Sequence, residues 1–70
     1  MLTKTKKLTR QLDEHIGREF WLPAIKTIRE RDGCGLRYAA LTLLFQSAWL
    51  GKVHRVPRGL VRIAREGLAR

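Results

Sequence analysis

Apolar residues recur every four positions in the first third of the chain. Leu8, Leu12, Ile16 and Phe20 follow this spacing, and polar or charged residues fill most of the positions between them. A repeat of this kind places the apolar side chains along one stripe of an α-helix. The pattern therefore predicts an amphipathic helix over residues 5–21, with these four residues as its buried stripe.

Proline and glycine mark the limits of a second element. Pro23 lacks an amide donor and disfavours helical geometry at the residue before it, so the chain should kink or restart there. We expect a helix over residues 23–31, with Pro23 in its first turn and with Ile25 and Ile28 facing inward. Gly33 should end this helix, because glycine readily adopts the left-handed conformation that closes one.

The stretch 36–50 differs in kind, because eleven of its fifteen residues are apolar. On a helical projection these side chains surround nearly the whole circumference. A helix that is apolar on all sides needs cover on all sides, and a chain of 70 residues has few other elements to provide it. We therefore expect a homodimer built on this helix. The expected interface residues are Tyr38, Leu41, Phe45 and Trp49.

Polar and apolar residues alternate over residues 52–56, which indicates a short extended segment. Pro57 then opens a fourth helix over residues 58–69. The expected buried face of this helix consists of Leu60, Val61, Ile63, Ala64 and Leu68. Together these elements predict an all-α fold, a compact bundle of three to four short helices in a single domain of residues 1–70, in which residues 1–7 can form a flexible basic arm.

The charge of the chain is high and unevenly distributed. Fifteen lysines and arginines against six acidic residues give a net charge of +9. Residues 36–70 carry seven of the basic groups and one acidic group, Glu66. Such a surface attracts polyanions, of which nucleic acid is the commonest in cytoplasm. An acidic protein surface is the next partner to consider.

The composition also limits the chemistry that the chain can carry. Cys34 is the single cysteine, so an intrachain disulfide is excluded, and zinc-type clusters of cysteine and histidine are absent. We expect no metal or other cofactor. A basic N-terminus without a following apolar stretch does not predict a secretory signal, and the apolar stretch 36–50 is too short to span a membrane. These features indicate a cytoplasmic protein.

The best candidate for a binding site is a set of arginines on the fourth helix. Arg58, Arg62 and Arg65 are four and three residues apart, so they share one helix face, which Lys52 and Arg55 extend. Cations on a rigid element suit a phosphate backbone. The alternative is an ordinary solvated helix face, but such faces normally mix charges of both signs, whereas this one is nearly all basic. A second, weaker candidate is the N-terminal set of Lys4, Lys6, Lys7 and Arg10.

Other residues do not form a recognisable site. A standard helix-turn-helix would use the stretch 36–50 as its reading helix, which offers too few polar groups to bases, and a divergent version that reads with the fourth helix stays open. His15, Cys34 and His54 lack motifs around them, so we do not expect an enzyme. The sequence favours a small nucleic-acid-binding protein with a regulatory role. The alternative is an adaptor or inhibitor, of the kind that mobile genetic elements encode, acting on a larger host complex.

Overall fold

The computed structural model describes residues 2–68, and this part of the chain contains helices and no strands. Four α-helices follow one another: α1 (Leu2–Gly17), α2 (Trp21–Asp32), α3 (Leu36–Trp49) and α4 (Arg58–Leu68). A 3-10 turn, η1 (Val53–Arg55), precedes α4. The all-α prediction is therefore confirmed for the described residues, and the segment expected to be extended is a 3-10 turn instead.

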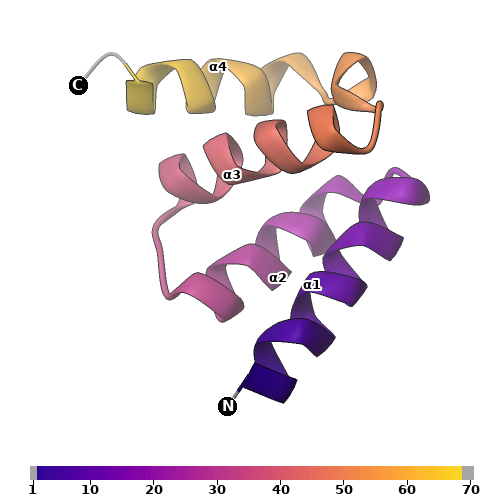
Figure 1. Ribbon diagram of the computed structural model, residues 1–70. Helices are drawn as coiled ribbons and strands as arrows, with labels where there is room; N and C mark the ends of the chain where they lie inside the picture. Colours follow the sequence, from indigo (N-terminus) through magenta and orange to yellow (C-terminus); the bar gives the residue numbers. More distant parts are fainter. Residues whose placement is uncertain (1, 69–70) are drawn as a thin grey trace.

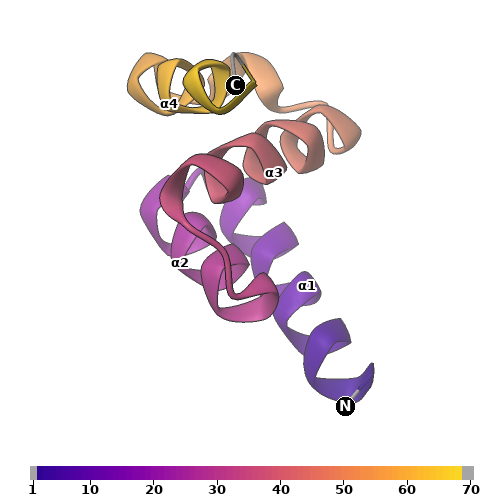
Figure 2. The same cartoon turned by 90° about the vertical axis from the view of Figure 1, so that its left-hand side faces the viewer.

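α3 is the central element of the bundle. α1 and α2 pack against each other, α2 also contacts α3, and α4 lies along the opposite side of α3. The view turned by 90° shows the same order, with α3 between α4 and the α1–α2 pair (Figure 2). The α3–α4 pair runs antiparallel, so the end of α4 returns to the beginning of α3 (Figure 1).

The core lies where α1, α2 and α3 meet, and α4 adds one buried residue to it. Leu12 and Ile16 from α1, Ile28 from α2 and Leu43 from α3 have no exposed surface. Ile25 and Val56 also belong to this core, together with four alanines that allow close approach of the helices, namely Ala24, Ala39, Ala40 and Ala64. Two side-chain hydrogen bonds also tie the helices together. Gln46 Nε2 donates to Asp13 Oδ1 (2.8 Å), and Arg31 Nη1 donates to Thr9 Oγ1 (3.1 Å).

α1 is shorter at its C-terminus than its apolar spacing predicts. The amide of Phe20 donates to the carbonyl of His15 (2.8 Å), and the amide of Glu19 donates to the carbonyl of Ile16 (3.0 Å). These two bonds form a Schellman motif, which requires a left-handed residue at its turn. Glu19, with φ of 60°, is that residue. Leu8 and Ile16 are buried as expected, but Phe20 lies beyond the helix and is exposed.

α2 begins at Trp21, two residues before the predicted start, so that Pro23 lies in its first turn. An amide is not needed at that position, which explains why the proline does not break the helix. Thr27 Oγ1 donates to the Pro23 carbonyl (2.9 Å), one turn back along α2. Gly33, with φ of 63°, caps the other end by donating its amide to the Arg29 carbonyl (2.8 Å). The predicted glycine stop is confirmed.

α3 has one buried face and one uncovered face. Ala39, Ala40, Leu43 and Ser47 are buried, and they face the core. The opposite side is exposed to solvent, so one chain does not cover α3 on all sides, and the expected pairing of two copies stays a prediction. The side chains exposed there are large, namely Tyr38 (59% exposed), Phe45 (67%) and Trp49 (84%).

α4 packs along α3 and contributes one fully buried residue to the bundle. Ala64 is its buried residue, and Leu60, Val61 and Ile63 are half-buried. Leu68 was expected on the buried face but is exposed, because in this last turn of α4 it is Gly67 that lies against Arg37 of α3.

Candidate nucleic-acid interface

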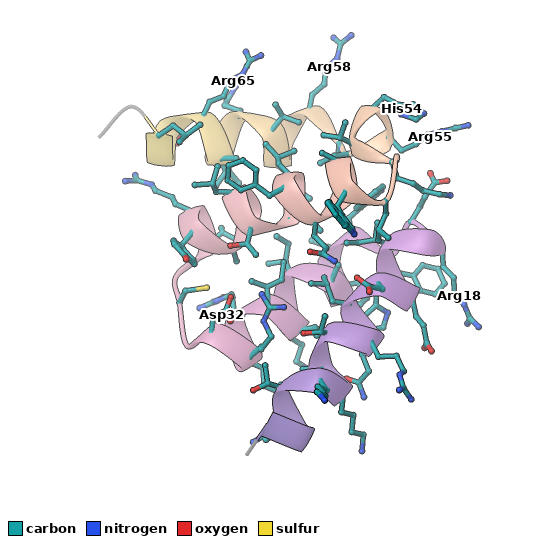
Figure 3. The ribbon with its side chains drawn as sticks, in the orientation of Figure 1. Arg18, Asp32, His54, Arg55, Arg58 and Arg65 are labelled. Carbon is teal, nitrogen blue, oxygen red and sulfur yellow. The ribbon has the colours of Figure 1, made fainter. Side chains whose placement is uncertain are left out.

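The amphipathic pattern of α4 directs its arginines away from the bundle. Leu60 and Ala64 face α3, so residues half a turn away face solvent. Arg58, Arg62 and Arg65 are all exposed. Figure 3 shows Arg58 and Arg65 extending from the side of α4 that faces away from α3. We call these three residues the arginine face.

The arginine face has dimensions that suit a phosphate backbone. Its three residues and Val61 line a shallow hollow of about 350 Å³ on the surface of α4. From Arg58 to Arg65 the helix rises by about 10 Å. A duplex strand carries one phosphate per about 3.4 Å of its axis, so this length matches about three phosphates.

Arg55 and Lys52 extend the arginine face unequally. Arg55 is exposed on η1, and Figure 3 shows it at the same end of the molecule as Arg58. Lys52 is half-buried, and its Nζ donates to the Gly17 carbonyl (3.2 Å) and lies 3.8 Å from Glu19 Oε2. Lys52 therefore ties the segment before η1 to the α1–α2 turn, while Arg55 remains available to a ligand.

Acidic groups are scarce around the arginine face. Over residues 4–68, the side-chain ion pairs are Arg31 with Asp32 and Lys52 with Glu19. The hydrogen bond from Arg31 lowers the pKa of Asp32 below its ordinary value, and this pair lies on α2. Within the same residues, Arg55, Arg58, Arg62 and Arg65 have no paired carboxylate. Their charge is therefore available to an external anion.

The N-terminal basic residues form a separate group. Lys4, Lys6, Lys7 and Arg10 are exposed and belong to α1, so residues 2–7 are helical and do not form an arm. Figure 1 places the start of α1 at the opposite end of the molecule from α4. The two predicted basic sets therefore do not combine into one surface.

The residues that could carry catalytic chemistry lie on different elements. His15 is on α1, His54 is on η1, and Cys34 lies between α2 and α3. Within the described part of the chain, no group of three metal-binding side chains comes together. None of the helices over residues 2–68 is long and apolar enough to cross a membrane.

The sequence did not reveal a second surface feature, which is an apolar hollow beside the start of α4. Phe20 and Leu22, which follow α1, line it together with Leu60 and Ile63 from α4. The two segments are about forty positions apart in the chain, so spacing alone could not bring them together. The nearest signal was the apolar run that continues past the end of the α1 stripe, at Phe20-Trp21-Leu22.

Comparison of the chain with protein-family models, with curated proteins and with solved structures finds no match.

Proposed function

We propose that the chain is a small nucleic-acid-binding protein with a regulatory role, and that the arginine face of α4 contacts phosphates. The observation that carries this proposal is the grouping of three exposed guanidinium groups on one helix face, without paired carboxylates over residues 4–68. Arginine remains charged at physiological pH and binds phosphate oxygens in bidentate geometry. Arg55 adds a fourth cation at the N-terminal end of the face.

The measurement is the fluorescence anisotropy of a labelled duplex at several salt concentrations. Four phosphate contacts per chain predict that the logarithm of the affinity falls with a slope of about −3.6 against the logarithm of salt concentration. Arg58→Ala, Arg62→Ala and Arg65→Ala should each weaken binding to all sequences alike and reduce the slope by about one unit per chain. The helical content of these variants should not change, because the three side chains are exposed.

Arg29→Ala is the matched control. Arg29 is an exposed arginine on α2, beside Glu30, and its Nε lies 3.4 Å from the Cys34 carbonyl. Its removal should change the affinity less than any change on the arginine face. Absence of binding at low salt, or equal effects of Arg29→Ala and Arg62→Ala, would refute the proposal. An adaptor or inhibitor of an acidic protein would then become the leading function.

We further propose that two copies pair through the outer face of α3, which consists of Tyr38, Leu41, Phe45 and Trp49. Leu41 is half-buried and the three aromatic residues are exposed. A fully buried aromatic side chain covers about 150–250 Å². The three aromatic residues are each more than half exposed. Pairing would therefore cover about 400 Å² of aromatic surface per copy. That is about half of what each partner contributes to a standard interface. Arg37 is the one charged residue of α3, so this face approaches its copy with little repulsion.

Sedimentation velocity tests the pairing. The wild-type chain should sediment as a dimer at micromolar concentration, and Trp49→Ser should shift it to monomer. Trp49 is 84% exposed in the wild-type chain. The Trp49→Ser variant should therefore give the same helical circular dichroism signal as the wild type. A dimer would also double the salt slope to about −7. A wild-type chain that sediments as a monomer at these concentrations would refute the pairing. It would not bear on the nucleic-acid proposal, which the anisotropy measurement tests separately.

A further inference from the structure

An apolar groove runs along the side of the molecule formed by α2 and the start of α4. One part of it is a hollow of about 540 Å³ lined by Phe20, Trp21, Leu22, Leu60 and Ile63, among other residues. All of these side chains are apolar or aromatic, and Pro23 and Pro57 also line the hollow. A concave surface of this size and composition is typical of a site that receives a bulky apolar side chain.

The groove continues along the outer side of α2. A second hollow, of about 760 Å³, shares Leu22 with the first and is also lined by Ile25 and Leu36. Leu22 therefore forms the ridge between two neighbouring hollows. Its side chain is 74% exposed, and Phe20 in the first hollow is 49% exposed. Two adjacent apolar hollows separated by an exposed leucine offer places for two anchoring side chains of one ligand.

The second hollow carries a positive balance of charge. Lys26 and Arg29 line it together with a single acidic residue, Glu30. Within the described residues none of these three takes part in an ion pair. A ligand that places carboxylates beside its apolar anchors would therefore gain charge complementarity at this end of the groove.

We propose that this groove binds an acidic amphipathic segment of a partner protein, with one bulky apolar side chain in each hollow and carboxylates facing Lys26 and Arg29. The proposal concerns a surface distinct from the arginine face, so it does not depend on nucleic-acid binding. A second copy of the chain is a poor occupant, because it carries a net charge of +9 itself. The outer face of α3 lacks this conflict, since none of the residues that form it, Tyr38, Leu41, Phe45 and Trp49, is charged.

The test selects ligands from a displayed library of random peptides, with counter-selection against the Leu22→Ser variant. Leu22 is mostly exposed, so this substitution removes the ridge of the groove and leaves the fold intact. Enriched peptides should carry two bulky apolar residues within two helical turns and an excess of aspartate and glutamate. Enriched peptides that are basic or lack apolar anchors would overturn the proposal. So would a selection in which no peptide is enriched on the wild-type chain relative to the Leu22→Ser variant.

Binding of an enriched peptide is then measured by fluorescence anisotropy. Leu22→Ser should weaken it at least tenfold, and Leu68→Ser, which changes an exposed leucine outside the groove, should weaken it less than twofold. The double change Lys26→Glu with Arg29→Glu should abolish binding, and a peptide with lysine in place of its acidic residues should bind this variant instead. Equal effects of Leu22→Ser and Leu68→Ser would overturn the assignment to the groove.

Two further readouts separate this groove from other surfaces. Cys34 lines the second hollow and is half-buried, so a bound peptide should slow its alkylation at least threefold. The triple change of Arg58, Arg62 and Arg65 to alanine should leave peptide binding within twofold, which distinguishes the groove from the arginine face. If that triple variant loses the peptide, or if Leu22→Ser changes the oligomeric state of the free chain, the proposal is wrong.

Discussion

The hydroxyl group of Ser47 is a specific weakness in the core. Ser47 lies on the inner face of α3 without exposed surface, and its Oγ has no hydrogen-bond partner among the described residues. An unsatisfied buried polar group costs about 1–3 kcal/mol. Alanine is also the better helix former, by about 0.5 kcal/mol. The small void left by one oxygen atom offsets about 0.3 kcal/mol of this gain. Ser47→Ala should therefore stabilise the protein by about 1–3 kcal/mol.

Ala48→Ser is the matched control for this prediction. Ala48 is the next residue of α3 but is exposed, so introducing serine there tests helix propensity without burial. It should cost about 0.5 kcal/mol, and the remaining difference between the two variants measures the buried hydroxyl.

Thermal unfolding followed by circular dichroism at one fixed protein concentration provides the measurement. For a chain of this size, 1 kcal/mol shifts Tm by about 4–8 °C. Ser47→Ala should therefore raise Tm by at least that amount, and urea titration should give the same order of the variants. A neutral or lowered Tm would refute the reasoning, because it would show that the hydroxyl has a partner that stabilises α3.

Three smaller effects follow from the helix ends. Gly33→Ala should lower stability by about 1 kcal/mol in urea titration, because φ of 63° is unfavourable for alanine. Glu19→Gly should raise stability by about 0.5 kcal/mol in the same assay, since glycine tolerates φ of 60° and the exposed pair with Lys52 contributes little. The lowered pKa of Asp32 stabilises the fold above the ordinary carboxyl pKa, and this contribution is lost as pH falls through the lowered value. Because the pair with Arg31 is partly exposed, Asp32→Asn should remove only a few tenths of a kcal/mol of that acid dependence, measured as Tm against pH.

The number and order of the helices could be predicted because they depend on local signals. The four-residue spacing of Leu8, Leu12 and Ile16 defines α1, and Gly33 supplies the left-handed residue that ends α2. These signals act over a few residues, so they do not depend on how the rest of the chain packs. The arginine face was predictable for the same reason, since three arginines at helical spacing must share one side of α4.

The end of α1 could not be predicted, because the residue at its turn is atypical. A Schellman motif normally places glycine in the left-handed position, and here Glu19 occupies it. The apolar pattern also continued to Phe20, which favoured a longer helix. The helix ends early because the chain must reverse to pack α2 against α1, and that tertiary contact outweighs the local preference.

Two features could not be predicted from the sequence, because they depend on how the helices pack: which side of α3 is covered, and the presence of the groove. Composition indicated that α3 needed cover on every side, but the position of α4 decides which side is covered. The groove arises because the α1–α2 turn and the start of α4 meet, which places Leu22 beside Leu60 and Ile63. Residues so far apart in sequence meet only through tertiary packing, and no local pattern carries that information.

The two proposed surfaces meet on α4, which packs along α3 but has fewer buried residues of its own than α2 or α3. The arginine face occupies its outer side, and Leu60 and Ile63 on its inner flank line the groove. Across Arg58–Leu68 a single residue, Ala64, is buried, whereas α2 contributes four buried residues. Amides protected by few buried contacts exchange through local opening at low free energy.

Hydrogen exchange should therefore be at least tenfold faster in α4 than in α2, a difference of about 1.4 kcal/mol in opening free energy. Ala64→Gly should raise exchange further in α4 while leaving the amides around Ile28 unchanged. A groove ligand that holds Leu60 and Ile63 should slow exchange in α4 and, by linkage, strengthen nucleic-acid binding at the arginine face. Equal protection of α2 and α4 in the free protein would contradict this, because it would mean that α4 opens only when the whole bundle unfolds.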